Sequence, residues 1–176
     1  MNGSERAITR SDKTRAVTER SERVGEALQA ENAMVAVAES STGGLVSSRL
    51  TDVPGASAHF ERGVVTYANA AKTDLLDVSP ATIEDHGAVS APTARQMARG
   101  VCALAGTAWG VSTTGVAGPG GGTERTPVGT VYIGVTHAQE AAVETTVERH
   151  EFDGTRRECK AQFAGQALAD LLARLD

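Results

Sequence analysis

Residues 35–50, VAVAESSTGGLVSSRL, decide the fold, because here a predicted strand passes into a predicted helix through a polar hinge. The apolar residues 34–38 (MVAVA) predict a buried strand, and residues 45–50 predict a short helix. The hinge between them, residues 39–44, holds one carboxylate, three hydroxyl groups and two glycines. This composition raises the question of what the hinge does.

The hinge allows two interpretations. A strand that enters a helix through glycines leaves backbone N–H groups unpaired, and these donors and the helix dipole favour an anion such as phosphate. Gly43 and Gly44 would let a ligand approach the backbone closely, and Ser40, Ser41 or Thr42 could donate a hydrogen bond or act as a nucleophile. The other interpretation is an ordinary helix cap with packing glycines. The local residues leave both open.

Helical and strand patterns alternate along the rest of the chain. Apolar spacing predicts a helix to about residue 30, and Asn69 and Ser90 can cap two later helices, the second with Met97, Val101 and Leu104 on one face. Further strands are predicted at 62–67, 108–113, 130–136 and 142–149, and further helices at 80–86 and 155–174.

The order of these elements predicts one domain with an α/β fold in layers. The last two strands form a hairpin, so the sheet of about five strands should be mixed rather than purely parallel. A chain of 176 residues can bury a sizeable core, and we expect the domain to cover residues 13–176 after a disordered tail at 1–12.

Composition and charge exclude several classes of protein. A net charge of -5 argues against binding nucleic acid through a general basic surface. No run of 18 apolar residues predicts a membrane span, and the polar start MNGSERAITR is not a secretory signal. Cys102 and Cys159 lack metal or redox spacing and lie in apolar helical patterns, so we expect buried free thiols in a cytoplasmic protein.

A second candidate site is the glycine-rich loop at residues 115–129, GVAGPGGGTERTPVG, which also follows a predicted strand. Loops at the carboxyl ends of strands form the ligand crevice of α/β sheets. The loop lacks the Gly-Lys-Ser/Thr ending of a P-loop, and the dinucleotide fingerprint G-x-G-x-x-G is absent. A flexible connector is the alternative.

Tyr67 and Lys72, in TYANAAK, are candidates for acid–base chemistry beside a serine. A lysine must lose its proton to act as a base, so Lys72 would have to be partly buried or lie beside another cation. Their spacing of five residues does not match the short-chain dehydrogenases, and Gly43 stands where the S-x-x-K pattern would need a lysine after Ser40. Taken alone, Tyr67 could be a strand residue and Lys72 a solvated helix residue.

The ordered set of motifs resembles the carboxy-terminal domain of the CinA family, the nicotinamide-nucleotide amidases, also called NMN deamidases. The resemblance covers about residues 20–175, and such a chain, without room for the extra amino-terminal domain of larger members, would be a stand-alone form. The matching blocks are AESSTGG (38–44), TDVPGAS (51–57), GVVTYANAAK (63–72), HGAVS (86–90), TGVAGPGGGT (114–123) and PVGTVYIGV (127–135).

The resemblance implies a three-layer α/β/α domain, a homodimer and hydrolysis of the carboxamide of nicotinamide mononucleotide to nicotinate mononucleotide and ammonia. It places the nucleophile at Ser40, a base at Lys72 and a proton relay or orienting group at Tyr67, with no metal and no organic cofactor. The resemblance also implies a substrate-binding set, in which backbone N–H groups near Thr42 and Gly43 hold the oxyanion: Glu39, Thr42, Gly43, Gly44, Asn69, Thr114, Gly115, Gly118 and Arg156.

The chain departs from the family pattern in its hinge and near the last helix. Ser41 replaces a cysteine of the hinge block, Thr155 replaces the aspartate of the F-x-G-D-R motif, and Lys160 stands where a second arginine is common. None of these changes removes a proposed catalytic group. The alternatives to an amidase are a non-catalytic nucleotide-binding or regulatory domain on the same scaffold, and a hydrolase of another amide or phosphorylated substrate.

Overall fold

The structure is a computed structural model that describes residues 10–175, with side chains from residue 16 onward. The helices are α1 (Arg10–Ala30), α2 (Leu45–Thr51), α3 (Asn69–Leu76), α4 (Pro80–His86), α5 (Ala91–Ala105), α6 (Arg156–Leu175) and the short 3-10 helix η1 (Ala56–Ala58). The strands are β1 (Val35–Glu39), β2 (Phe60–Val65), β3 (Trp109–Gly115), β4 (Thr130–Gln139) and β5 (Ala142–Glu151).

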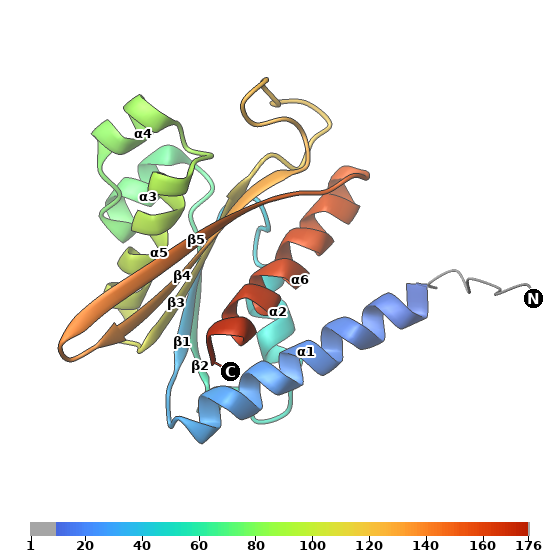
Figure 1. The fold of residues 1–176 in the computed structure, drawn as a ribbon, viewed down its shortest axis with the longest axis vertical. Helices are drawn as coiled ribbons and strands as arrows, with labels where there is room; N and C mark the ends of the chain where they lie inside the picture. The colour runs from blue at the N-terminus through green and yellow to red at the C-terminus, as the bar shows by residue number, and fades with distance from the viewer. Residues whose placement is uncertain (1–9, 176) are drawn as a thin grey trace, which may run out of the picture.

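One five-stranded sheet in the order β2-β1-β3-β4-β5 forms the middle layer (Figure 1). Strands β2, β1 and β3 are parallel, while β4 and β5 form an antiparallel hairpin, which confirms the mixed sheet. Helices α1, α2 and α6 cover one face, and α3, α4 and α5 lie on the other (Figure 1). The predicted α/β/α layering is therefore confirmed.

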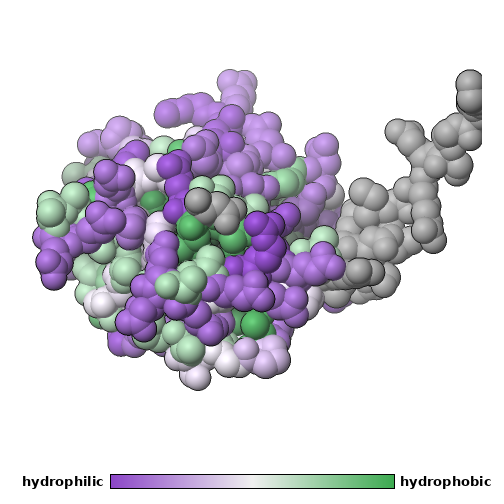
Figure 2. All heavy atoms as spheres, turned by 60° about the horizontal axis from the view of Figure 1, so that its bottom comes forward, coloured by the Kyte–Doolittle hydropathy of each residue, from purple (hydrophilic) through white to green (hydrophobic). Residues whose placement is uncertain are grey.

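The surface seen in Figure 2 is mostly hydrophilic, with small apolar spots between the polar side chains. This distribution is ordinary for a folded domain, because some apolar surface always stays exposed. None of the described helices is both long and apolar enough to cross a membrane.

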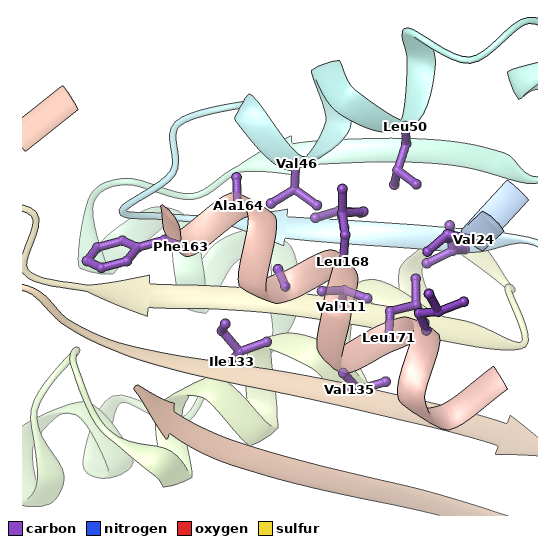
Figure 3. Close-up of a cluster of buried hydrophobic side chains, with 14 of the residues drawn as sticks. Val24, Val46, Leu50, Val111, Ile133, Val135, Phe163, Ala164, Leu168 and Leu171 are labelled. Atoms are coloured by element: carbon purple, nitrogen blue, oxygen red, sulfur yellow. The ribbon is translucent and has the colours of Figure 1, made fainter. Parts of the chain in front are cut away.

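The larger core lies between the sheet and the helix layer that contains α6. Val35 and Val37 of β1 point into this core, whereas Ala36 and Ala38 point into the smaller core on the opposite face. All five residues of β1 are buried, as expected of a central parallel strand covered on both faces. Figure 3 shows Phe163, Leu168 and Leu171 of α6 in the larger core beside Val46 and Leu50 of α2.

Several boundaries differ from the sequence predictions. Strand β2 spans residues 60–65 rather than 62–67, so Tyr67 lies beyond its end. Residues 1–9 of the predicted tail (1–12) lie outside the described residues. Residues 10–12 belong to α1 and not to a tail.

Two predictions about single helix residues are wrong. Asn69 is the first residue of α3 and not its cap, because Ala68 occupies the N-cap position. Leu104 is 42% exposed, because the buried side of α5 runs through Ala98 and Cys102. By contrast, Ser90 caps α5 as predicted, since its side chain accepts a hydrogen bond from Thr93 N–H.

Candidate functional site

The candidate site lies at the carboxyl ends of the three parallel strands, where α/β sheets place ligands. β1 delivers Glu39 and the hinge, β2 leads into Thr66 and Tyr67, and β3 ends in the glycine-rich loop. The hinge is joined to both neighbours through the backbone: Ser40 N–H donates to Thr113 O (3.0 Å), and Thr66 N–H donates to Glu39 O (2.8 Å).

Lys72 and Ser40 meet inside this site. The Lys72 side chain comes from α3, is 1% exposed, and its Nζ donates to Ser40 Oγ (3.2 Å), Thr66 O (2.8 Å) and Tyr67 O (3.2 Å). None of the salt bridges found among the described residues involves Lys72. Burial away from water lowers the pKa of the Lys72 amine, because it disfavours the charged form. Lys72 is thus buried against the hydroxyl that it could deprotonate.

Glu39 lies beneath the start of α2 and not at an open surface. Its side chain is fully buried, and its two carboxylate oxygens accept hydrogen bonds from Gly44 N–H (2.8 Å), Val46 N–H (3.1 Å), Ser47 N–H (2.8 Å) and Ser47 Oγ (2.7 Å). These are the helix-start donors that the sequence suggested for a ligand anion. The protein's own carboxylate occupies them, so that interpretation of the helix start is wrong.

The hinge itself keeps free donors. Within the described chain, the backbone N–H groups of Ser41, Thr42 and Gly43 form no hydrogen bond. The hinge conformation is fixed by a hydrogen bond between Thr42 Oγ1 and Thr113 Oγ1 (2.7 Å) and by left-handed backbone angles at Gly43 and Gly44, with φ of 62° and 96°. Three consecutive unpaired N–H groups next to Ser40 can bind a developing negative charge.

Tyr67 contributes its carbonyl to Lys72 but directs its phenol elsewhere. The side chain is 62% exposed, and its hydroxyl accepts a hydrogen bond from the Arg156 guanidinium (2.9 Å). In residues 16–175, no hydrogen bond joins the phenol to Ser40 or Lys72, so the expected proton relay has no contact to support it. Arg156 also donates to Gly118 O (2.6 Å) and thereby ties the glycine-rich loop to α6 and Tyr67.

The remaining candidate residues lie close by with different surroundings. Thr114 is buried, and its hydroxyl donates to Ala88 O (2.6 Å) in the connection between α4 and α5. Gly115 packs against the backbone at the start of β4, where a side chain would collide with Thr130 O. Asn69 is exposed at the start of α3 without a capping hydrogen bond. Their expected contact with substrate stays a prediction.

A basic pocket adjoins the hinge. It has a volume of about 610 Å³ and no acidic residue among the described residues that line it, which are Leu45, Arg49, Arg156, Arg157, Lys160 and Ala161. The Lys160 ammonium reaches over the hinge, 3.1 Å from where a Cβ of residue 43 would lie. Four cations in one pocket form a suitable site for a phosphate group.

Arg49 is the pocket residue that the sequence did not reveal. Its guanidinium donates to Ala161 O (2.8 Å), and burial lowers its pKa, as does the positive charge of Arg20, against the opposing effects of Glu39 and Asp52. One arginine in a seven-residue helix carries no pattern that could have marked it. The described residues contain no group of three or more His, Cys, Asp or Glu side chains arranged to hold a metal ion.

Comparison with known proteins gives a consistent family. The CinA C-terminal domain matches residues 17–175. A CinA-like protein of Chlorobaculum tepidum is 55% identical over 142 residues, which are 80% of this chain and 34% of that protein. The chain thus spans about a third of the length of the curated relatives it matches.

Solved structures of similar size share the fold. The competence/damage inducible protein CihA of Agrobacterium tumefaciens gives a TM-score of 0.82 at 38% identity, covering 90% of this chain and 94% of that one. A CinA superfamily protein of Escherichia coli gives a TM-score of 0.82 at 31% identity, covering 98% of each chain. Sequence and fold therefore agree over nearly all of the described residues, and the chain belongs to the CinA family through its C-terminal domain.

Proposed function

We propose that this domain hydrolyses the carboxamide of nicotinamide mononucleotide, giving nicotinate mononucleotide and ammonia. The observation that carries the proposal is the 3.2 Å contact between Lys72 Nζ and Ser40 Oγ in a buried site. A serine paired with a desolvated lysine is suited to attack an amide carbon. The resemblance of the chain to nicotinamide-nucleotide amidases supplies the substrate.

The first half of the reaction forms an ester on Ser40. Neutral Lys72 takes the proton of Ser40 Oγ, and the oxygen attacks the carboxamide carbon to give a tetrahedral species with a negative oxygen. When the C–N bond breaks, Lys72 returns that proton to the nitrogen, and ammonia leaves.

The second half consumes one water molecule. Lys72 accepts a proton from the water as its oxygen attacks the ester carbon. The bond to Ser40 Oγ then breaks, and Lys72 returns the proton to the serine. The product carboxylic acid ionises to nicotinate at neutral pH, and the site is restored.

Three further features support this proposal. The N–H groups of Ser41, Thr42 and Gly43, which have no partner among the described residues, could hold the tetrahedral oxyanion. The basic pocket beside Gly43 offers Arg49, Arg156, Arg157 and Lys160 to the phosphate. The exposed Tyr67 ring, whose hydroxyl is hydrogen-bonded to Arg156 of the basic pocket, could contact the pyridine ring.

The direct test is ammonia release from nicotinamide mononucleotide by the wild type and by Ser40→Ala. We expect the substitution to reduce kcat by about 10³-fold or more, because the nucleophile is lost. Ser41→Ala is the matched control: it removes the neighbouring hydroxyl, which is buried without a hydrogen-bond partner, and keeps the backbone N–H. Ser41→Ala should keep kcat within about threefold of the wild type.

The alternatives predict other outcomes in the same assay. A binding or regulatory domain would bind the nucleotide without releasing ammonia. A hydrolase of another substrate would leave nicotinamide mononucleotide intact and act on another member of a panel of phosphorylated amides. Ser40→Ala with undiminished turnover would contradict the nucleophile assignment.

A further inference from the structure

Glu39 lies one residue before the proposed nucleophile, yet its carboxylate is fully buried and hydrogen-bonded within the protein. Both oxygens are used within the protein: Oε2 accepts from Gly44 and Val46 N–H, and Oε1 accepts from the N–H and hydroxyl of Ser47. The side chain has no exposed surface. A direct contact with substrate is therefore not the role that the structure supports.

The hydrogen bonds to the Glu39 carboxylate determine which backbone N–H groups near Ser40 remain available to a ligand. Gly44, the N-cap of α2, has no side chain to cap the helix, and Glu39 supplies the capping acceptor from the preceding strand. The first-turn donors of α2 thus bind Glu39, while the N–H groups of Ser41, Thr42 and Gly43 have no partner among the residues that the structure describes. The donors are divided into an internal set and a set beside Ser40.

Contacts around Glu39 hold the hinge and the start of α2 in a single conformation. Ser47 Oγ lies against Gly63 of β2, where any side chain would collide with it. On the other side, Thr42 is held to Thr113 of β3 by its hydroxyl. The hinge is thus held to β3 through Thr42, while Ser47, which donates to the Glu39 carboxylate, packs against β2.

We propose that Glu39 is a positioning residue that holds the hinge in the conformation presenting its three free N–H groups to the oxyanion formed at Ser40. This inference rests on the proposed amide hydrolysis and adds to it a requirement for a carboxylate at position 39. An ionised carboxylate only accepts hydrogen bonds, which matches four donors.

Glu39→Gln tests this requirement with almost no change in shape. Whichever way the amide is turned, its NH2 group faces one of the two donor pairs, so that pair loses its acceptor. The hinge should shift, and kcat should fall about 100-fold, as when an oxyanion donor is removed, while KM changes less than about threefold.

The matched control is Val24→Ala, a truncation of a fully buried α1 residue in the larger core. It lowers the melting temperature without touching the hinge, so its kcat should stay within about threefold of the wild type. If Glu39→Gln remains folded and also keeps kcat within that range, the positioning role is overturned. The positioning role is also overturned if Glu39→Gln lowers kcat only because part of the protein is unfolded. Covalent labelling of Ser40, described below, would then show fewer reactive sites, each with the wild-type turnover rate.

A second readout separates this inference from the proposed function. The rate at which an alkyl fluorophosphonate modifies Ser40 also depends on stabilising a negative oxygen beside the serine. A wild type that is labelled at Ser40 but releases no ammonia would contradict the substrate only, and slower labelling of Glu39→Gln would then still support the positioning role. Equal labelling rates, or no labelling of the wild type, would contradict it.

Discussion

At the scale of single residues, the proposed reaction requires a neutral Lys72 to activate Ser40. Burial lowers the pKa of the Lys72 amine, so the neutral base forms at a lower pH than for an exposed lysine. We predict that kcat/KM for ammonia release rises with pH through one ionisation below the usual lysine value of about 10.4. Initial rates measured across the pH range in which the protein stays folded would show this rise in kcat/KM.

Substitutions at position 72 identify the ionising group. Lys72→Arg keeps the positive charge but cannot become neutral, so it should lose about 10³-fold in kcat. In Lys72→Ala, added primary amines should restore part of the rate. If kcat/KM of Lys72→Ala rises with pH as in the wild type, the ionisation belongs to another group.

The contrast between Lys72 and Glu39 shows what sequence reasoning can reach. The resemblance to a known family, and not the spacing of the residues by itself, paired Ser40 with Lys72, and the structure places their side-chain atoms in contact. That resemblance could not separate a substrate-binding glutamate from one that caps the next helix, because both follow a strand and precede glycines. The resemblance also singled out Tyr67 as a site residue, but it did not predict where the phenol points. The Tyr67 hydroxyl is hydrogen-bonded to Arg156, 89 positions away.

At the scale of elements, α6 combines a structural face with a basic end. Its apolar stripe packs in the larger core, while Arg156 and Lys160, one turn apart, line the basic pocket. We predict that Lys160→Gln lowers kcat/KM for nicotinamide mononucleotide about 10-fold, since a charged hydrogen bond contributes about 1.5–3 kcal/mol. The rate with nicotinamide riboside, which lacks the phosphate, should stay unchanged.

Arg174→Gln is the matched control for the charge of Lys160. Arg174 lies in the last turn of the same helix and is exposed, away from the pocket residues. Steady-state kinetics with both substrates should show no change in this variant. Equal losses for the nucleotide and the riboside in Lys160→Gln would place the phosphate elsewhere.

The central strand and the last helix were each predicted to within one residue at both ends. The central strand β1 and the stripe of α6 follow from apolar periodicity, because burial leaves little choice of residue. The edge strand β2 has only partly buried and exposed residues, so its ends were misplaced by two positions. The prediction that Leu104 lies on the buried face of α5 was wrong for a related reason. Its spacing from Met97 and Val101 fits one helix face, but the packing of α5 against the sheet determines which residues are buried.

At the scale of the whole molecule, His59 links α1, α2 and the start of β2. Its ring is fully buried, its Nδ1 lies 3.2 Å from Gln29 Nε2, and the ring fills the space beside Gly25. Burial lowers the pKa of His59, so the folded state favours the neutral ring. Above the unfolded-state pKa of about 6.5 this contribution to stability is complete, and it is lost as the pH falls below that value.

We therefore predict that acidification from about pH 7.5 to 5.5 lowers the free energy of unfolding of the wild type more than that of His59→Gln. The difference has an upper limit of about 1.4 kcal/mol for each pH unit below the unfolded-state pKa. Urea unfolding at several pH values measures it. Parallel pH dependences for the two proteins would show that His59 does not titrate in this way.

The candidate site draws its parts from widely separated parts of the described chain, from Glu39 in β1 to Lys160 in α6. During synthesis on a ribosome, the strand–hinge unit and Lys72 emerge before the arginines and the lysine of α6. The same helix closes the larger core. A nascent chain that still lacks α6 would therefore have neither a sealed larger core nor the basic pocket, so both can form only after this helix has been synthesised.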